Sequence, residues 1–111
     1  MIRSPLLQAR IAWLIGCFAE QDLPSDVKSQ IYSTLTQLLA SGTLGVRLEA
    51  VRALSRCDTW DFDAAAFVQH VPNVMDGLVA LMSETTLPES HLAINRIFAM
   101  VLDRYGKEVS L

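Results

Sequence analysis

Apolar residues recur at intervals of three and four positions along almost the whole chain, and this periodicity constrains the fold more than any other feature. The first stretch is typical, with its apolar positions at Leu7, Ile11, Leu14, Ile15 and Phe18. Alternating runs of β-branched residues and Asn-Gly hairpin signals do not occur in the sequence. The pattern therefore predicts an all-α fold without strands.

Helix breakers and capping residues divide the sequence into five helical stretches. Pro5 follows a serine cap, and Gly42 terminates the second stretch. Pro72 removes a backbone donor inside the fourth stretch, which either kinks there or splits into a short helix to His70 and a second piece from Pro72. The expected helices cover residues 5–20, 24–40, 44–57, 63–82 (broken near Pro72) and 88–105.

The spacing of these helices indicates a helical-repeat architecture. Short connections make consecutive helices antiparallel, and the first helix recurs as the third after about 40 residues, the period of HEAT and armadillo repeats. We expect an α-α superhelix with two helical hairpins plus the first helix of a third. An apolar fraction of 51% is high for 111 residues. This excess predicts one segment, residues 1–111, of a longer solenoid whose end helices pack on neighbouring repeats.

Charge and hydropathy argue against two classes of partner. The net charge is −3, the isoelectric point is about 5.2, and no cluster of Lys or Arg occurs in the sequence, so direct binding to nucleic acid is not expected. The apolar run 11–19 is too short to cross a bilayer, so membrane association is not expected either.

Metal binding and catalysis lack the required residue patterns. The four possible metal ligands, Cys17, Cys57, His70 and His91, are scattered and no pair has zinc-site spacing. The neighbours Ser90 and His91, and the carboxylates Asp61 and Asp63, stand at helix starts where capping explains them. Since no glycine-rich phosphate loop occurs either, we expect no metal, no cofactor and no catalytic residue. The chain is predicted not to be an enzyme.

Protein binding is the remaining function, and the second helix is the predicted surface for it. In helical solenoids, one helix of each repeat lines the concave surface. The polar residues expected to contact a partner there are Lys28, Ser29, Tyr32, Ser33 and Thr36. Trp60 either pins its turn or presents an exposed binding edge, whereas Trp13 is expected to pack between helices. Arg47 and Arg52 are expected to pair with acidic residues of the adjacent repeat.

Three stretches resemble one protein family. They are the Ala-Arg-Ile-Ala-Trp-Leu-Ile-Gly helix at 9–16, the Val-Arg-x-x-Ala helix at 46–54, and residues 58–71, where an acidic turn with an aromatic residue leads into the next helix. In this order they are similar to the importin-β (karyopherin-β) family of nuclear transport receptors. The third stretch, followed by residues 93–105, resembles the middle of the importin-eleven branch most closely. The resemblance covers nearly the whole chain. One departure is Cys17-Phe18, where relatives often carry Gln-Trp.

The resemblance implies a function that the residue pattern alone does not supply. Such receptors are HEAT-repeat superhelices that bind protein cargo, Ran-GTP and phenylalanine-glycine nucleoporin repeats, and they shuttle between cytoplasm and nucleus through the nuclear pore. The chain would be a central segment, with Ran-GTP bound through other repeats. The alternative is a HEAT scaffold subunit of a non-transport complex. In either case we expect the isolated segment to self-associate through exposed apolar faces of its end helices.

Overall fold

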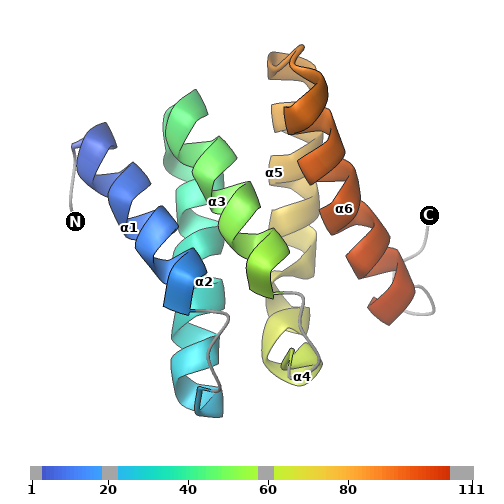
Figure 1. The fold of residues 1–111 in the computed structure, drawn as a ribbon. Helices are drawn as coiled ribbons and strands as arrows, with labels where there is room; N and C mark the ends of the chain where they lie inside the picture. Colours follow the sequence, from blue (N-terminus) through green and yellow to red (C-terminus); the bar gives the residue numbers. More distant parts are fainter. Residues whose placement is uncertain (1–3, 19–22, 58–61, 106–111) are drawn as a thin grey trace.

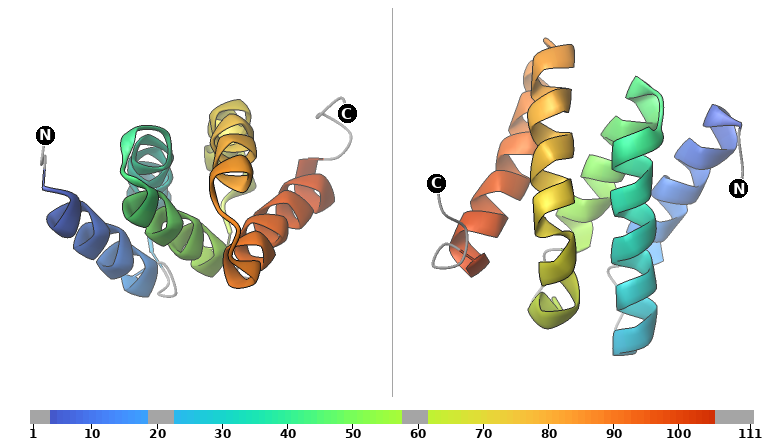
Figure 2. Two further views of the ribbon diagram at one scale, coloured as in Figure 1. Left: turned by 90° about the horizontal axis from the view of Figure 1, so that it is seen from above. Right: turned by 180° about the vertical axis from the view of Figure 1, so that it is seen from behind.

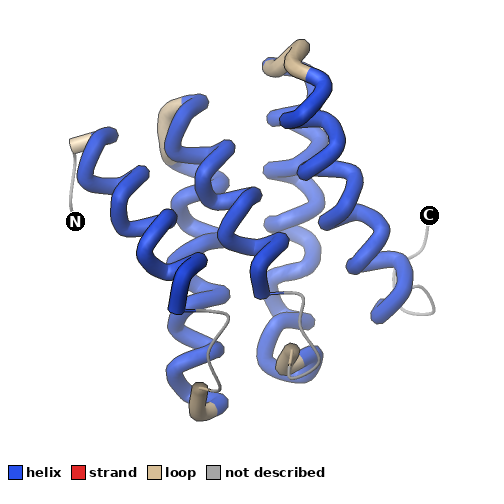
Figure 3. The backbone as a smooth tube through the Cα atoms, in the orientation of Figure 1, coloured by secondary structure: helices blue, strands red, loops and turns tan. Residues whose placement is uncertain are grey.

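The prediction of an all-α fold is confirmed by the computed structural model, which describes residues 4–18, 23–57 and 62–105. No strand occurs in these three ranges. Figure 1 shows the order of the elements, and Figure 3 shows the tight connections at residues 42–43 and 85–87. The elements are α1 (Pro5–Phe18), α2 (Ser25–Ser41), α3 (Leu44–Cys57), α4 (Ala64–Phe67), a 3-10 turn (Val68–His70), α5 (Val71–Glu84) and α6 (Pro88–Tyr105).

The fourth stretch is divided rather than kinked. Asp63 begins it as the N-cap of α4, where its carboxylate accepts the N–H of Ala66 at 3.0 Å. The 3-10 turn ends at His70, and Pro72 follows in the first turn of α5. Proline is well tolerated there because the N–H groups of a first turn have no partner within the helix.

The helices form two layers, an arrangement compatible with HEAT-like repeats. Seen from above, α1, α3 and α6 lie on one side and α2 and α5 on the other (Figure 2). Within the first layer α1 packs extensively on α3, and α3 packs on α6. Within the second layer α2 packs on α5. Each helix thus contacts the next one of its own layer as well as the opposite layer.

The structure groups the helices into hairpins α2–α3 and α5–α6, with α1 preceding them. Residues 42–43 join α2 to α3, and residues 85–87 join α5 to α6. In addition, α2 packs far more extensively on α3 than on α1. The structure thus contains the expected two hairpins and one further helix, and the grouping by contact places the further helix first instead of last. The shorter connection of α2 lies on its C-terminal side.

An aromatic cluster joins the two layers at one end of the molecule. Tyr32, Phe62 and Phe67 pack with ring centroids 5.3 to 5.4 Å apart. Tyr105 stacks on Phe67, and its hydroxyl donates to the Ala64 carbonyl at 2.8 Å. Because these residues come from α2, α4, α6 and the approach to α4, the cluster fixes the short α4 against both layers.

The end helices expose apolar side chains, as the sequence predicts. On α1, Leu6, Leu7 and Leu14 are 69%, 53% and 49% exposed. On α6, Leu92 is 56% and Leu102 is 42% exposed. Among the described residues, no helix is both long and apolar enough to span a membrane.

Candidate protein-binding surfaces

Two of the residues predicted to contact a partner, Tyr32 and Thr36, are buried, so the sequence-based assignment of their side chains to an exposed surface is wrong. Tyr32 is only 2% exposed and Thr36 only 6%. The Thr36 hydroxyl donates to the Tyr32 carbonyl at 2.7 Å, and the Tyr32 hydroxyl accepts the N–H of Asp63 at 3.2 Å. Their polar groups are therefore satisfied inside the molecule rather than offered to a partner.

The other predicted contact residues remain proposals. Lys28, Ser29 and Ser33 are half-buried on α2. Trp60 lies outside the described residues.

The α2/α5 groove is a hollow of about 370 Å³ between the two helices of the second layer. Gln37 of α2 and Asn73 and Asp76 of α5 provide its polar lining. Arg47 reaches it from α3 and forms an ion pair with Glu84 at 2.6 Å. This hydrogen bond lowers the pKa of the Glu84 carboxyl. The arginine that lines this groove, Arg47, is therefore already paired with a carboxylate.

The two arginines expected to form ion pairs between repeats behave differently. Arg47 pairs with Glu84 at the end of α5. In the expected grouping the helices 44–57 and 63–82 belong to one hairpin, so this ion pair does not confirm a contact with an adjacent repeat. Arg52 pairs instead with Glu49 on its own helix, at 2.6 Å, so the prediction for Arg52 is wrong. Residues three positions apart on a helix are neighbours, and this local pair forms without a second element.

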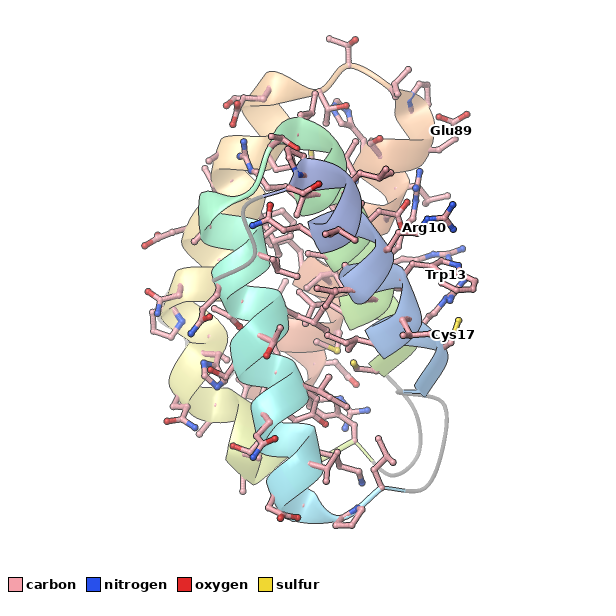
Figure 4. All side chains as sticks on the ribbon, turned by 90° about the vertical axis from the view of Figure 1, so that its left-hand side faces the viewer. Arg10, Trp13, Cys17 and Glu89 are labelled. Carbon is pink, nitrogen blue, oxygen red and sulfur yellow. The ribbon has the colours of Figure 1, made fainter. Side chains whose placement is uncertain are left out.

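A second surface lies on the solvent side of the first layer, and we call it the α1/α3/α6 face. Figure 4 shows Arg10, Trp13 and Cys17 of α1 on the same side of the molecule as Glu89 of α6. The face is defined by these four residues together with those that line its grooves, namely Glu49, Arg52 and Arg56 of α3 and Arg96 and Asp103 of α6. Cys17 and Glu49 are half-buried, and the other side chains are exposed.

Trp13 lines a groove on this face instead of packing between helices, so the expectation for it is wrong. Its side chain is 48% exposed. The Trp13 groove has a volume of about 200 Å³, and Glu49, Arg52 and Arg56 of α3 form its opposite wall. The Arg56 guanidinium also approaches the Cys17 sulfur, with 3.6 Å between Nη1 and Sγ.

Small residues explain why the Trp13 groove exists. Ala12, Gly16 and Ala53 form its floor. A Cβ built on Gly16 would lie 3.2 Å from the Ala53 Cα, so α1 and α3 approach closely at this point. Close approach of the two backbones leaves a shallow floor between the larger side chains on either side.

A further hollow of about 480 Å³ continues the face from α3 to α6. It is lined by Ser55 on α3 and by Arg96, Met100 and Asp103 on α6. The α1/α3/α6 face therefore carries a groove between each pair of adjacent helices.

Cys57 and His91, two of the possible metal ligands, each have a different environment. Cys57 is 4% exposed, and burial raises the pKa of its thiol to about 12. A nitrogen of the His91 ring lies 2.6 Å from the Thr85 carbonyl oxygen. Within the described ranges, no three His, Cys, Asp or Glu side chains gather in an arrangement that could hold a metal ion.

Comparison with known proteins finds one kind of relative. The chain is 23% identical over 104 residues to Importin-11 of Homo sapiens, and the same figures hold for Importin-11 of Mus musculus. The match covers 93% of this chain but 11% of each relative, so the chain spans a small part of their length. No family model and no solved structure matches the chain. The chain is thus similar to one segment of an importin.

Proposed function

We propose that the chain is a protein-binding segment of a nuclear transport receptor of the importin-β type, which carries protein cargo through nuclear pores under Ran-GTP control. The observation that supports this most is the similarity to Importin-11, which runs over 93% of the chain. The two-layered helical arrangement fits such a receptor, because helical repeats bind extended partners along their layers. No enzymatic activity is part of this proposal.

The proposed mechanism uses the contacts between hairpins. Each repeat contacts only its neighbours, so small rotations between hairpins add up to a large change in curvature along a solenoid. In this chain, the Arg47–Glu84 ion pair and the contact of α2 with α5 join the two hairpins. Cargo and Ran-GTP, each binding best to a different curvature, would then weaken one another's binding.

This function places the protein in both cytoplasm and nucleus, with passage through the nuclear pore. Its partners would be protein cargo, phenylalanine-glycine repeats of nucleoporins, and Ran-GTP bound through other repeats of the receptor. The competing function is a helical-repeat scaffold subunit of a complex outside transport. The same architecture serves both functions, and only the first requires a response to Ran-GTP.

A release experiment tests the proposal. The complete receptor is immobilised with its partners from a cell lysate, Ran locked in its GTP state is added, and the eluted proteins are quantified. Release of bound proteins is the expected result and identifies the cargo. No release together with no capture of Ran would contradict the transport function and favour the scaffold.

A further inference from the structure

We propose that the α1/α3/α6 face binds an extended acidic peptide segment of a partner protein, with one apolar side chain of that peptide in the Trp13 groove. This inference rests on the proposed protein-binding function and names the chemistry of the partner. Three independent observations support it: the distribution of charge between the layers, the geometry of the Trp13 groove, and the arrangement of the arginines across three helices.

The first observation is that charge is distributed unequally between the two layers. Among the described residues, α1, α3 and α6 carry six arginines and three carboxylates, a balance of +3. The second layer, α2 and α5, taken together with Asp63 at the start of α4, carries one lysine and four carboxylates, a balance of −3. A chain with a net charge of −3 therefore keeps one basic layer. Two of the six arginines do not belong to the face, since Arg47 pairs with Glu84 in the α2/α5 groove and Arg104 lies over the Phe62 ring. The face itself keeps four arginines against three carboxylates, and this excess of positive charge favours an acidic partner.

Some of the arginines on the face are available for such a partner. Within residues 4–18, 23–57 and 62–105, neither Arg10 nor Arg96 forms an ion pair. Arg52 is paired with Glu49, yet its side chain keeps 58% of its surface exposed. A planar guanidinium binds carboxylates through two parallel hydrogen bonds, which makes arginine well suited to acidic peptides.

The Trp13 groove supplies the apolar part of the site. Trp13 exposes 48% of its surface beside a floor of alanine and glycine, and the groove volume of about 200 Å³ accommodates a single side chain. Tryptophan and arginine are the residues most enriched where a few side chains carry most of a binding energy. An apolar side chain flanked by carboxylates would therefore fill the groove while its neighbours meet Arg52 and Arg56.

The arrangement across three helices indicates an extended peptide. Packed helices lie about 8–10 Å apart, so the path from α1 over α3 to α6 is about 20 Å. An extended chain rises about 3.3 Å per residue, so about six to eight residues cover that path. Such a segment would pass Arg10 and Trp13 first, then Arg52, and finally Arg96.

A nucleic acid fits this face less well than a peptide does. Glu49, Glu89 and Asp103 are interspersed with the arginines. A phosphate backbone carries a negative charge at every nucleotide and would meet these carboxylates, whereas a peptide can place an uncharged residue opposite each one.

The test measures fluorescence anisotropy of the 111-residue chain with a labelled nine-residue probe of four glutamates, one phenylalanine and four glutamates. Replacing the glutamates by glutamines provides an uncharged probe. The variants are Arg10→Glu, Arg52→Glu and Trp13→Ala, and the control is Gln30→Glu, which adds a negative charge at an exposed position of α2. Circular dichroism of each variant verifies that it remains helical.

We expect the acidic probe to bind, the uncharged probe to bind at least about tenfold more weakly, and each face variant to lose about tenfold in affinity. Gln30→Glu should stay within about twofold of the unchanged chain, because Gln30 lies on the other layer. Equal losses for Gln30→Glu and Arg52→Glu would overturn the proposal, as would equal binding of both probes. Displacement of the acidic probe by an equimolar single-stranded oligonucleotide of nine nucleotides would also overturn it.

The failure of this inference and that of the transport function are distinguishable. If Arg52→Glu in the complete receptor leaves Ran-GTP-sensitive binding of lysate proteins intact and the probe does not bind, the peptide site is wrong and the transport function stands. If the probe binds as expected but Ran-GTP releases nothing, the peptide site stands and the transport function is wrong.

Discussion

Gly77 on α5 faces Leu39 on α2 so closely that a Cβ built on Gly77 would lie 2.8 Å from the Leu39 Cγ. Such an approach is possible only because glycine has no side chain, and it occurs where hairpin α5–α6 meets hairpin α2–α3. The contact belongs to the interface between repeats, on which any change of curvature would depend.

Gly77→Ala should destabilise the fold by about 1–3 kcal/mol, the usual penalty for overpacking a core, even though alanine is the better helix former. Gly45→Ala is the matched control because no atom lies within 4 Å of a Cβ built there. The control should be neutral or should stabilise the fold by up to about 1 kcal/mol. Urea denaturation measures both changes. A Gly77→Ala variant as stable as the control would show that α2 and α5 separate easily.

Leu54 on α3 provides a test of the core between the two layers. It is fully buried, so Leu54→Ala should lower the free energy of unfolding by about 2–5 kcal/mol through lost burial and a residual cavity. Leu102→Ala on α6 serves as the comparison, since that side chain is 42% exposed and its loss should cost less than about 1 kcal/mol. Thermal denaturation followed by circular dichroism distinguishes the two. Similar losses at both positions would contradict the assignment of Leu54 to the core.

Protonation of His70 should contribute to the pH dependence of the free energy of unfolding. Burial lowers the pKa of His70 below its ordinary value of 6.5, and its buried Nε2 has no hydrogen-bond partner among the described residues. The unfolded chain therefore binds a proton first as the pH falls through 6.5, and the folded state loses stability from there down to the lower pKa of folded His70. His70→Leu should remove this contribution from urea denaturation curves measured between pH 7.5 and 5. An unchanged slope in the variant would mean that His70 titrates equally in both states.

The two cysteines should differ in reactivity toward a thiol reagent. The raised pKa of Cys57, about 12, together with its burial keeps it a protonated thiol at pH 8, whereas Cys17 is half-buried. Ellman's reagent should therefore modify Cys17 first in the native protein, and both thiols in guanidinium chloride. Cys17→Ser should abolish the native reaction. Rapid native modification of that variant would contradict the burial of Cys57.

The helices could be predicted from the sequence because the signals that define them are local. The stripe of Val74, Leu78 and Leu81 identifies α5, and Pro72 marks the place near which the preceding stretch is interrupted. The pairing into hairpins could not be predicted in this way. It depends on how much of the α2 surface contacts α1 and how much contacts α3. The apolar positions of α2 alone do not show which of these two helices buries more of them.

The proposed binding surface was harder to predict, because residue type does not determine exposure. Tyr32 and Thr36 are polar, yet their hydroxyls are satisfied by the Asp63 N–H and by a carbonyl of the same helix. Conversely, Trp13 is apolar and was assigned to the interior, although Gly16, one turn away, lets α3 approach and leaves the indole at the surface. The sequence did contain one usable signal: the arginines are concentrated in the first, third and fifth stretches.

Site-specific photo-crosslinking tests most directly whether this segment binds proteins through its α1/α3/α6 face under the control of Ran-GTP, as proposed. A photoreactive phenylalanine analogue replaces Trp13 on this face or, as the control, Gln37 in the α2/α5 groove of the complete receptor. We predict crosslinks to cargo from position 13 that disappear when Ran-GTP is added, and few from position 37. Crosslinks from position 37 alone, or crosslinks from position 13 that persist with Ran-GTP, would contradict the account.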